Sequence, residues 1–132
     1  MTEKIHPFVE LLQQDQRYHI EAYQFVRDAL AYAQEILKMP GQGESGEHHI
    51  TGQQLCEAIR QFGLEQYGFM AKTVLNSWGV HNTGDFGEIV YNMIRIKHMK
   101  KSPSDRREDF DEVYDFATGF DPVFEFSGGD ED

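Results

Sequence analysis

The chain has 132 residues and a formal net charge of −11, and it contains one cysteine, Cys56. This length gives room for one domain with a buried core, without help from a metal or a disulfide. A single thiol excludes an internal disulfide and fits a reducing compartment. No apolar run reaches the roughly 18 residues of a membrane span, and no secretory signal is visible. We therefore expect a cytoplasmic protein that does not enter a membrane.

Negative charge is concentrated towards the C-terminus. Residues 1–107 contain all 12 lysines and arginines together with 13 acids, whereas residues 108–132 contain 10 acids and no base. We call the six bases that directly precede this acidic stretch the basic cluster: Arg95, Lys97, Lys100, Lys101, Arg106 and Arg107. This charge pattern makes the six either candidate interaction residues or groups that the following acids neutralise within the protein.

The first part of the chain predicts two helices and a loop. A short helix begins at Pro7, because proline is tolerated at the first helical position. Apolar residues then recur at intervals of three and four between about His19 and Lys38, which predicts an amphipathic helix. The stretch PGQGESGE, from Pro40 to Glu47, ends this helix and predicts a flexible loop.

Three further helices are predicted before the basic cluster ends. Thr51 opens the first of them, because its hydroxyl and the side chain of Gln54 can form a capping box. Gly68 ends this helix. A shorter helix follows from Phe69 to Trp78, and Gly79 ends it. The third begins near Thr83, and its last turn leads into the bases of the cluster.

The third of these helices contains the triplet Asp85-Phe86-Gly87, which holds magnesium in protein kinases. A kinase also needs a glycine-rich phosphate loop, a strand lysine and a His-Arg-Asp loop, and none precedes the triplet. A helix start explains it better. Thr83 can cap the helix, Asp85 suits the positive end of the helix dipole, and Phe86 begins an apolar stripe.

The segment from residue 102 to residue 117 predicts a last helix, which Ser102 or Ser104 would cap. Beyond Gly119 the helical pattern is lost, and residues 121–132 form an acidic tail that we expect to be flexible. The aromatic residues of this region either complete the core or form a segment that docks on a partner. The second alternative makes three of them candidate interaction residues: Phe120, Phe124 and Phe126.

No other motif nominates a catalytic, cofactor or metal site. His48 and His49 are adjacent, so their side chains point in different directions, and no third ligand follows at a zinc spacing. Cys56 has no histidine at a recognisable nucleophile spacing. We therefore predict no metal and no cofactor. An enzyme whose site assembles from residues such as His81, Cys56 or Asp85 stays an alternative.

Three short helices between residues 51 and 98 are also compatible with a helix-turn-helix core. The helix that would enter DNA, Phe69 to Trp78, carries only Lys72 as a base. A net charge of −11 is unfavourable for contact with a phosphate polyanion. Nucleic-acid binding, modulated by the acidic tail, is therefore an alternative and not the leading hypothesis.

Several segments together resemble a family of small bacterial proteins. They are AYQFVRDALAYAQ, HITGQQLCEAIRQFGLEQYGFMAKTVLNSWGV, TGDFGEIVYNMI and DRREDFDEVYDF, and the resemblance covers roughly Tyr18 to Phe116. The family has no assigned activity, cofactor or catalytic residue, so no role carries over. The resemblance implies a bacterial cytoplasmic protein with one helical domain.

These observations predict a mainly α fold. Residues 1–120 would form one domain of five or six helices, with a small two-stranded element from HHI and VFEF. The leading hypothesis for function is a non-enzymatic interaction or adaptor module that binds an unknown protein partner. Homodimerisation is also plausible, because several short helices are strongly apolar on one face.

Overall fold

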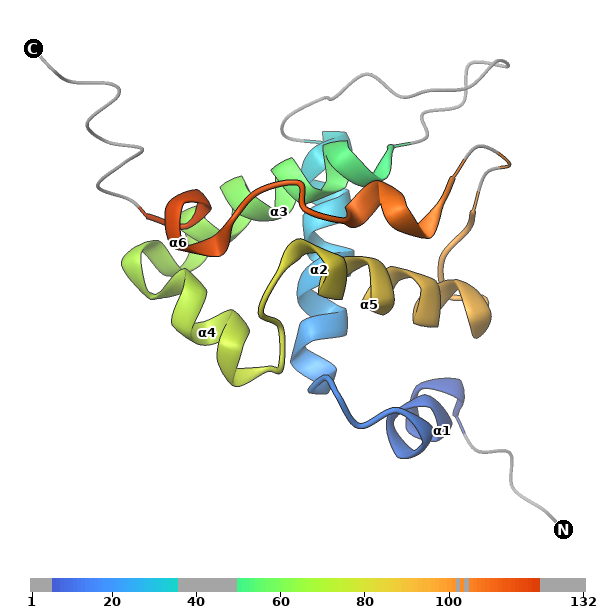
Figure 1. The fold of residues 1–132 in the computed structure, drawn as a ribbon. Coiled ribbons are helices and arrows are strands. Elements are labelled where there is room, and N and C mark those ends of the chain that lie inside the picture. The colour runs from blue at the N-terminus through green and yellow to red at the C-terminus, as the bar shows by residue number, and fades with distance from the viewer. Residues whose placement is uncertain (1–5, 36–49, 102, 104, 122–132) are drawn as a thin grey trace, which may run out of the picture.

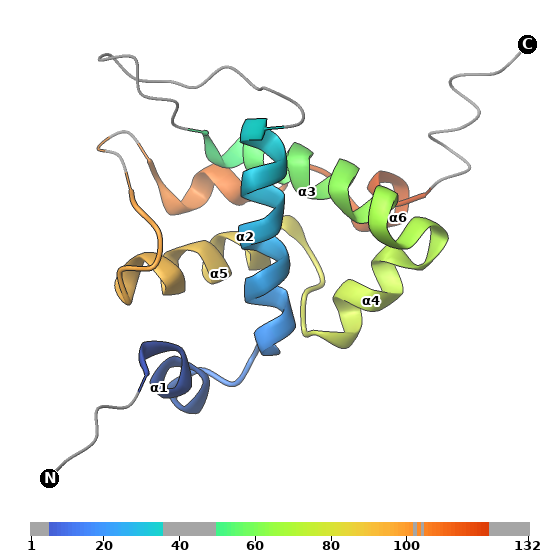
Figure 2. The same cartoon turned by 180° about the vertical axis from the view of Figure 1, so that it is seen from behind.

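Helix α2 (Ile20–Glu35) is crossed on one side by α3 (Gly52–Tyr67) and α5 (Thr83–Arg95), as two opposite views of this computed structural model show (Figures 1 and 2). The structure describes residues 6–35, 50–101, 103 and 105–121. The remaining elements are short: α1 (Pro7–Gln14), α4 (Ala71–Ser77), the single turn α6 (Phe116–Gly119), and the 3-10 turns η1 (Gly68–Met70) and η2 (Arg107–Phe110). The predicted mainly α fold is confirmed, and the described residues contain no strand.

One apolar core joins these elements. Val26 of α2, Ile59 of α3 and Phe86 of α5 are fully buried at its centre. Phe116 and Phe120, at the end of the described chain, are 4% and 3% exposed and belong to the same core. The core therefore extends to the last aromatic residue that the structure describes. None of the described helices is both long and apolar enough to cross a bilayer.

Most of the predicted helix boundaries are confirmed. The hydroxyl of Thr51 accepts a hydrogen bond from the backbone N–H of Gln54 at 3.1 Å, and the Gln54 side chain accepts one from the N–H of Thr51 at 2.9 Å. Gly68 ends α3 with φ +56°. Gly79 has φ +94°, and a Cβ there would collide with the carbonyl oxygen of Arg17. Glycine is needed at this turn because the linker before α2 lies directly against it.

The predicted cap of α5 is wrong by one residue. Asn82 is the N-cap, and its side-chain oxygen accepts a hydrogen bond from the N–H of Asp85 at 3.0 Å. Thr83 is instead the first helical residue and is fully buried. Its hydroxyl accepts a hydrogen bond from the N–H of Val113 at 3.1 Å. The hydroxyl of Thr83, which the sequence predicts as a helix cap, therefore binds the backbone of a distant segment instead.

The continuous helix predicted over residues 102–117 is also wrong. The turns η2 and α6 are separated by an irregular segment in which Glu112 has φ +52°. Phe110, Phe116 and Phe120 all turn into the core from this stretch. Phe110 and Phe116 are six residues apart, which on one straight helix would place their side chains about 120° apart around the axis. Tertiary packing of the aromatic rings therefore overrides the local helical spacing.

The helix predicted from Phe69 to Trp78 is divided into η1 and α4, with its α-helical part at Ala71–Ser77. Several predictions lie outside the described residues. These are the loop from Pro40 to Glu47, the caps Ser102 and Ser104, the acidic tail beyond Asp121, and all of the proposed two-stranded element except Ile50.

Candidate functional site

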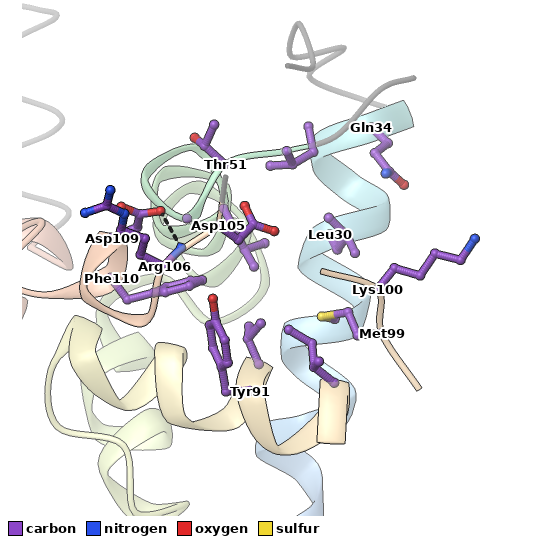
Figure 3. A pocket seen from close by; sticks show the side chains of 15 residues that line it. Leu30, Gln34, Thr51, Tyr91, Met99, Lys100, Asp105, Arg106, Asp109 and Phe110 are labelled. Carbon is purple, nitrogen blue, oxygen red and sulfur yellow. Dashed lines mark hydrogen bonds between the residues drawn. The ribbon is translucent and has the colours of Figure 1, made fainter. Parts of the chain in front are cut away.

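A pocket of about 310 Å³ opens between parts of the fold that are distant in the sequence (Figure 3). Its walls come from the C-terminal half of α2, the start of α3, the second half of α5, and the turn η2 with the residues just before it. Met99 and Lys100, which follow α5, complete it. The pocket thus exists only once these four regions have packed together.

The interior of the pocket is mainly apolar. Four of its side chains also belong to the core and are 5–8% exposed, and three more are half-buried. An apolar group that enters would leave water, which is favourable by about 25 cal/mol for each Å² buried. The apolar lining residues are Leu30, Ile50, Leu55, Val90, Ile94, Met99 and Phe110.

Gly52 holds the start of α3 close to η2 at the edge of the pocket. A Cβ at this position would lie 2.9 Å from Cβ of Asp109 and 3.1 Å from Cε2 of Phe110. Asp109 therefore lies beside the N-terminal end of α3, where the helix dipole favours a carboxylate. Its Oδ2 also accepts a hydrogen bond from the backbone N–H of Arg106 at 3.1 Å. A larger residue than glycine would push η2 away and reshape the pocket.

Tyr91 of α5 has a buried hydroxyl at this pocket. In Figure 3 the hydroxyl points from α5 towards Phe110 and the turn that carries Arg106 and Asp109. The oxygen has no hydrogen-bond partner among the described residues. Burial raises the pKa of Tyr91, and the nearby carboxylates of Asp105 and Asp109 raise it further. The phenol is therefore held in its neutral form, which can donate a hydrogen bond.

The structure divides the six residues of the basic cluster into three groups. Lys100 and Arg106 line the pocket and are exposed. Lys97 and Lys101 are also exposed. Arg95 donates to the Oδ1 of Asn92 at 2.9 Å, and Arg107 forms ion pairs within the chain. The basic cluster is therefore not a single site.

Arg107 is neutralised by acids on both sides of it in the sequence. Its Nε lies 2.7 Å from Oε2 of Glu88, and its Nη1 lies 2.8 Å from Oδ1 of Asp111. Glu88 also pairs with Arg17 at 3.1 Å. The hydrogen bond from Arg107, helped by the one from Arg17, lowers the pKa of Glu88. For Arg107, neutralisation within the protein is thus the alternative that the structure supports.

The ion pairs continue from Arg17 into the interior. Arg17 donates to both carboxylate oxygens of Asp15, at 3.0 and 2.7 Å. The amide of Asn92 donates to Asp15 and to the hydroxyl of Tyr23, at 3.0 and 3.1 Å. The hydrogen bond from Arg17 is the main cause that holds the pKa of Asp15 well below its ordinary value. This network fastens the linker before α2 to α5.

Two of the residues named for an unrecognised enzyme site, Cys56 and Asp85, have structural roles. Cys56 is fully buried, and burial raises the pKa of its thiol to about 12. Asp85 accepts hydrogen bonds from the hydroxyl of Tyr18 at 2.6 Å and from the N–H of His81 at 2.8 Å. Within the described ranges, no three His, Cys, Asp or Glu residues come together in a group that could hold a metal ion. His48 and His49 lie outside those ranges.

The C-terminal aromatic residues can be placed as far as Phe120. This ring is 3% exposed, and its Cε1 lies 3.1 Å from the position of a Cβ at Gly63. Phe120 is therefore a core residue and offers no exposed surface for docking. Phe124 and Phe126 lie outside the described residues.

The surface of α4 bears on the helix-turn-helix alternative. This helix has seven residues and carries one base, Lys72, which is exposed beside Thr73. α4 packs on α3, whereas α5 packs mainly on α2 and η2. A single exposed base gives α4 little attraction for a phosphate backbone.

Sequence reasoning missed the pocket and Tyr91. Tyr91 directly follows Val90, which belongs to the apolar stripe of α5. A position at the edge of this stripe predicts only partial burial of Tyr91. Nothing in the sequence indicates that η2 folds back over α5 and covers the hydroxyl. Their charge identifies Lys100 and Arg106 as candidate residues in the sequence. It does not show that both line the same pocket.

Comparison of the chain with protein-family models, with curated proteins and with solved structures finds no match. The resemblance to a family of small bacterial proteins therefore stays a prediction.

Proposed function

We propose that this protein is a non-enzymatic binding module whose site is the pocket between α2, α3, α5 and η2, and that it binds a small ligand there. The observation that carries the proposal is the combination of an apolar interior with a polar edge in a cavity of about 310 Å³. Pockets of this kind, from about 300 Å³ upwards, are typical of small-molecule sites. The buried thiol of Cys56 and the engaged carboxylate of Asp85 favour binding over catalysis.

The proposal can be tested with the ¹⁵N-labelled full chain and a library of small neutral aryl compounds. Binding at the pocket should shift the amide signals of Thr51 and Tyr91 while leaving those of Lys72 and Thr73 in α4 unchanged. The variant Met99→Trp places a larger side chain at the pocket and should abolish the shifts. If no compound perturbs the pocket amides at millimolar concentration, the pocket is not a ligand site.

The interaction module expected from the sequence is a second candidate, favoured by a different surface. Phe69 is 77% exposed and Met70 is 42% exposed on η1, at the corner between α3 and α4 (Figure 1). Exposed aromatic residues and methionine are enriched at protein interfaces. This corner would supply an apolar contact for a partner protein or for a second copy of the chain.

Phe69→Ser should remove that contact, and Val9→Ser is a matched control because Val9 is 47% exposed on α1. Affinity purification and light scattering of both variants would test the corner. Identical partners and identical molar mass for the two variants and the parent chain would refute this second candidate.

A further inference from the structure

The hydroxyl of Tyr91 is the only buried side-chain polar atom without a hydrogen-bond partner in the part of the chain that the structure describes. The residue that carries it lines the pocket, and the oxygen itself is shielded from solvent. Buried polar atoms are nearly always paired, so each exception needs an explanation. Two independent features, a mainly apolar cavity and an unpaired donor, therefore coincide at one place.

The polar groups around Tyr91 already have partners. The hydroxyl of Thr51 and the side-chain oxygen of Gln54 are used in the capping box. Asp109 accepts the backbone N–H of Arg106, and Asp105 has interactions of its own. Among the described residues, the phenol of Tyr91 is thus the buried side-chain donor at the pocket that has no partner, whereas Lys100 and Arg106 are exposed to solvent.

The charges at the edge of the pocket balance. Asp105 and Asp109 would repel an anion, and Lys100 and Arg106 would repel a cation. Bringing an ion into a mainly apolar cavity also requires its desolvation, which is costly without a specific opposite charge. A neutral oxygen acceptor, such as a carbonyl, needs no counter-charge and can accept the hydroxyl hydrogen of Tyr91.

We infer that the pocket accepts a small neutral molecule with an apolar body and a hydrogen-bond-accepting oxygen, and that η2, which covers the hydroxyl of Tyr91, shifts on binding so that this hydroxyl donates to the ligand oxygen. This inference rests on the proposed function, because it names the class of ligand for the same site. The volume, equal to that of on the order of ten water molecules, suits a single substituted aromatic ring.

Three probes of nearly equal shape test the inference: acetophenone with a carbonyl, cumene without it, and 1-phenylethylamine as a cation. Dissociation constants would be measured by NMR titration of the full chain and of Tyr91→Phe. Tyr67→Phe is the control, because Tyr67 packs against Phe25 and Trp78, away from the pocket. Loss of one neutral hydrogen bond should weaken acetophenone about five-fold in Tyr91→Phe, with cumene changed by less than about two-fold. Tyr67→Phe should change neither.

The other outcomes separate the two proposals. If acetophenone and cumene bind at the pocket but respond alike to Tyr91→Phe, the role of Tyr91 is refuted and the ligand site stands. If 1-phenylethylamine binds more tightly than acetophenone, the ligand class is wrong because the site prefers a cation. If none of the three probes shifts the pocket amides, the inference fails, and failure of the whole aryl library as well refutes the ligand site.

Discussion

Replacing Gly87 with alanine should destabilise the protein, although the change favours the helix locally. Alanine gains about 1 kcal/mol over glycine within an α-helix. Its Cβ, however, would lie 2.9 Å from Cβ of Phe110, 2.9 Å from Nη1 of Arg107 and 3.0 Å from its Cζ. Carbon atoms pack best at about 3.5–4.0 Å, so η2 would have to move away from α5.

The net effect follows from these opposing contributions. Overpacking against a buried ring typically costs about 1–3 kcal/mol, and Phe110 is 5% exposed. Displacing Arg107 also weakens its ion pair with Glu88, in which both side chains are about one-third exposed, by at most about 1 kcal/mol. After subtraction of the helical gain, these contributions span about 0–3 kcal/mol, so Gly87→Ala should lower the free energy of unfolding by a central value of about 1.5 kcal/mol.

Urea denaturation followed by circular dichroism would measure this difference. Gly84→Ala is a control on the same helix, since its Cβ would meet only side-chain ends, at 3.2–3.3 Å from Asn82, Asp111 and Arg107. The ends of Asp111 and Arg107 can adjust, and a weakened cap at Asn82 is offset by the helical gain of about 1 kcal/mol from alanine, so the control should remain within about 0.5 kcal/mol of the parent. A Gly87→Ala variant as stable as Gly84→Ala would refute the close approach of η2 to α5.

Three further results are expected. Tyr91→Phe should not lower the thermal midpoint, because it removes an unpaired hydroxyl, whereas Tyr23→Phe should cost about 1 kcal/mol with the loss of its hydrogen bond from Asn92; equal destabilisation would contradict this. Cys56 should react with Ellman's reagent at pH 8 only after unfolding, since its thiol is fully buried with a pKa of about 12; a rapid native reaction would show otherwise. The lowered pKa of Asp15 contributes stability that is complete above its ordinary value of 3.8 and is lost as the pH falls further. Urea midpoints of Asp15→Asn should therefore fall less than those of the parent between pH 5 and pH 2, and parallel curves would refute this role.

Much of the architecture could be predicted from local sequence signals. The capping box of Thr51 and Gln54, the glycine at position 68 and the apolar stripe from Phe86 act within a few residues, so their effect is visible in the sequence. The same holds for Pro7 at the start of α1. The triplet Asp85-Phe86-Gly87 lies near the start of α5, as its sequence context predicts.

The candidate site could not be predicted in the same way. Tyr91 and Arg106 are 15 positions apart in the sequence, and their common pocket depends on how η2 packs against α5. Gly52 and Gly87 allow that packing because, without a Cβ, they leave room for Phe110. The sequence alone does not show that Phe110 fills this room.

The sequence by itself determined where most helices begin and end, because caps, glycines and apolar periodicity act locally. The tertiary structure decided the rest. It turned the predicted last helix into two short turns, from which Phe110 and Phe116 both pack into the shared core and leave water. It also assigned Arg107 to Glu88 and Asp111, and it covered the hydroxyl of Tyr91. These outcomes depend on contacts between distant segments, which no local pattern encodes.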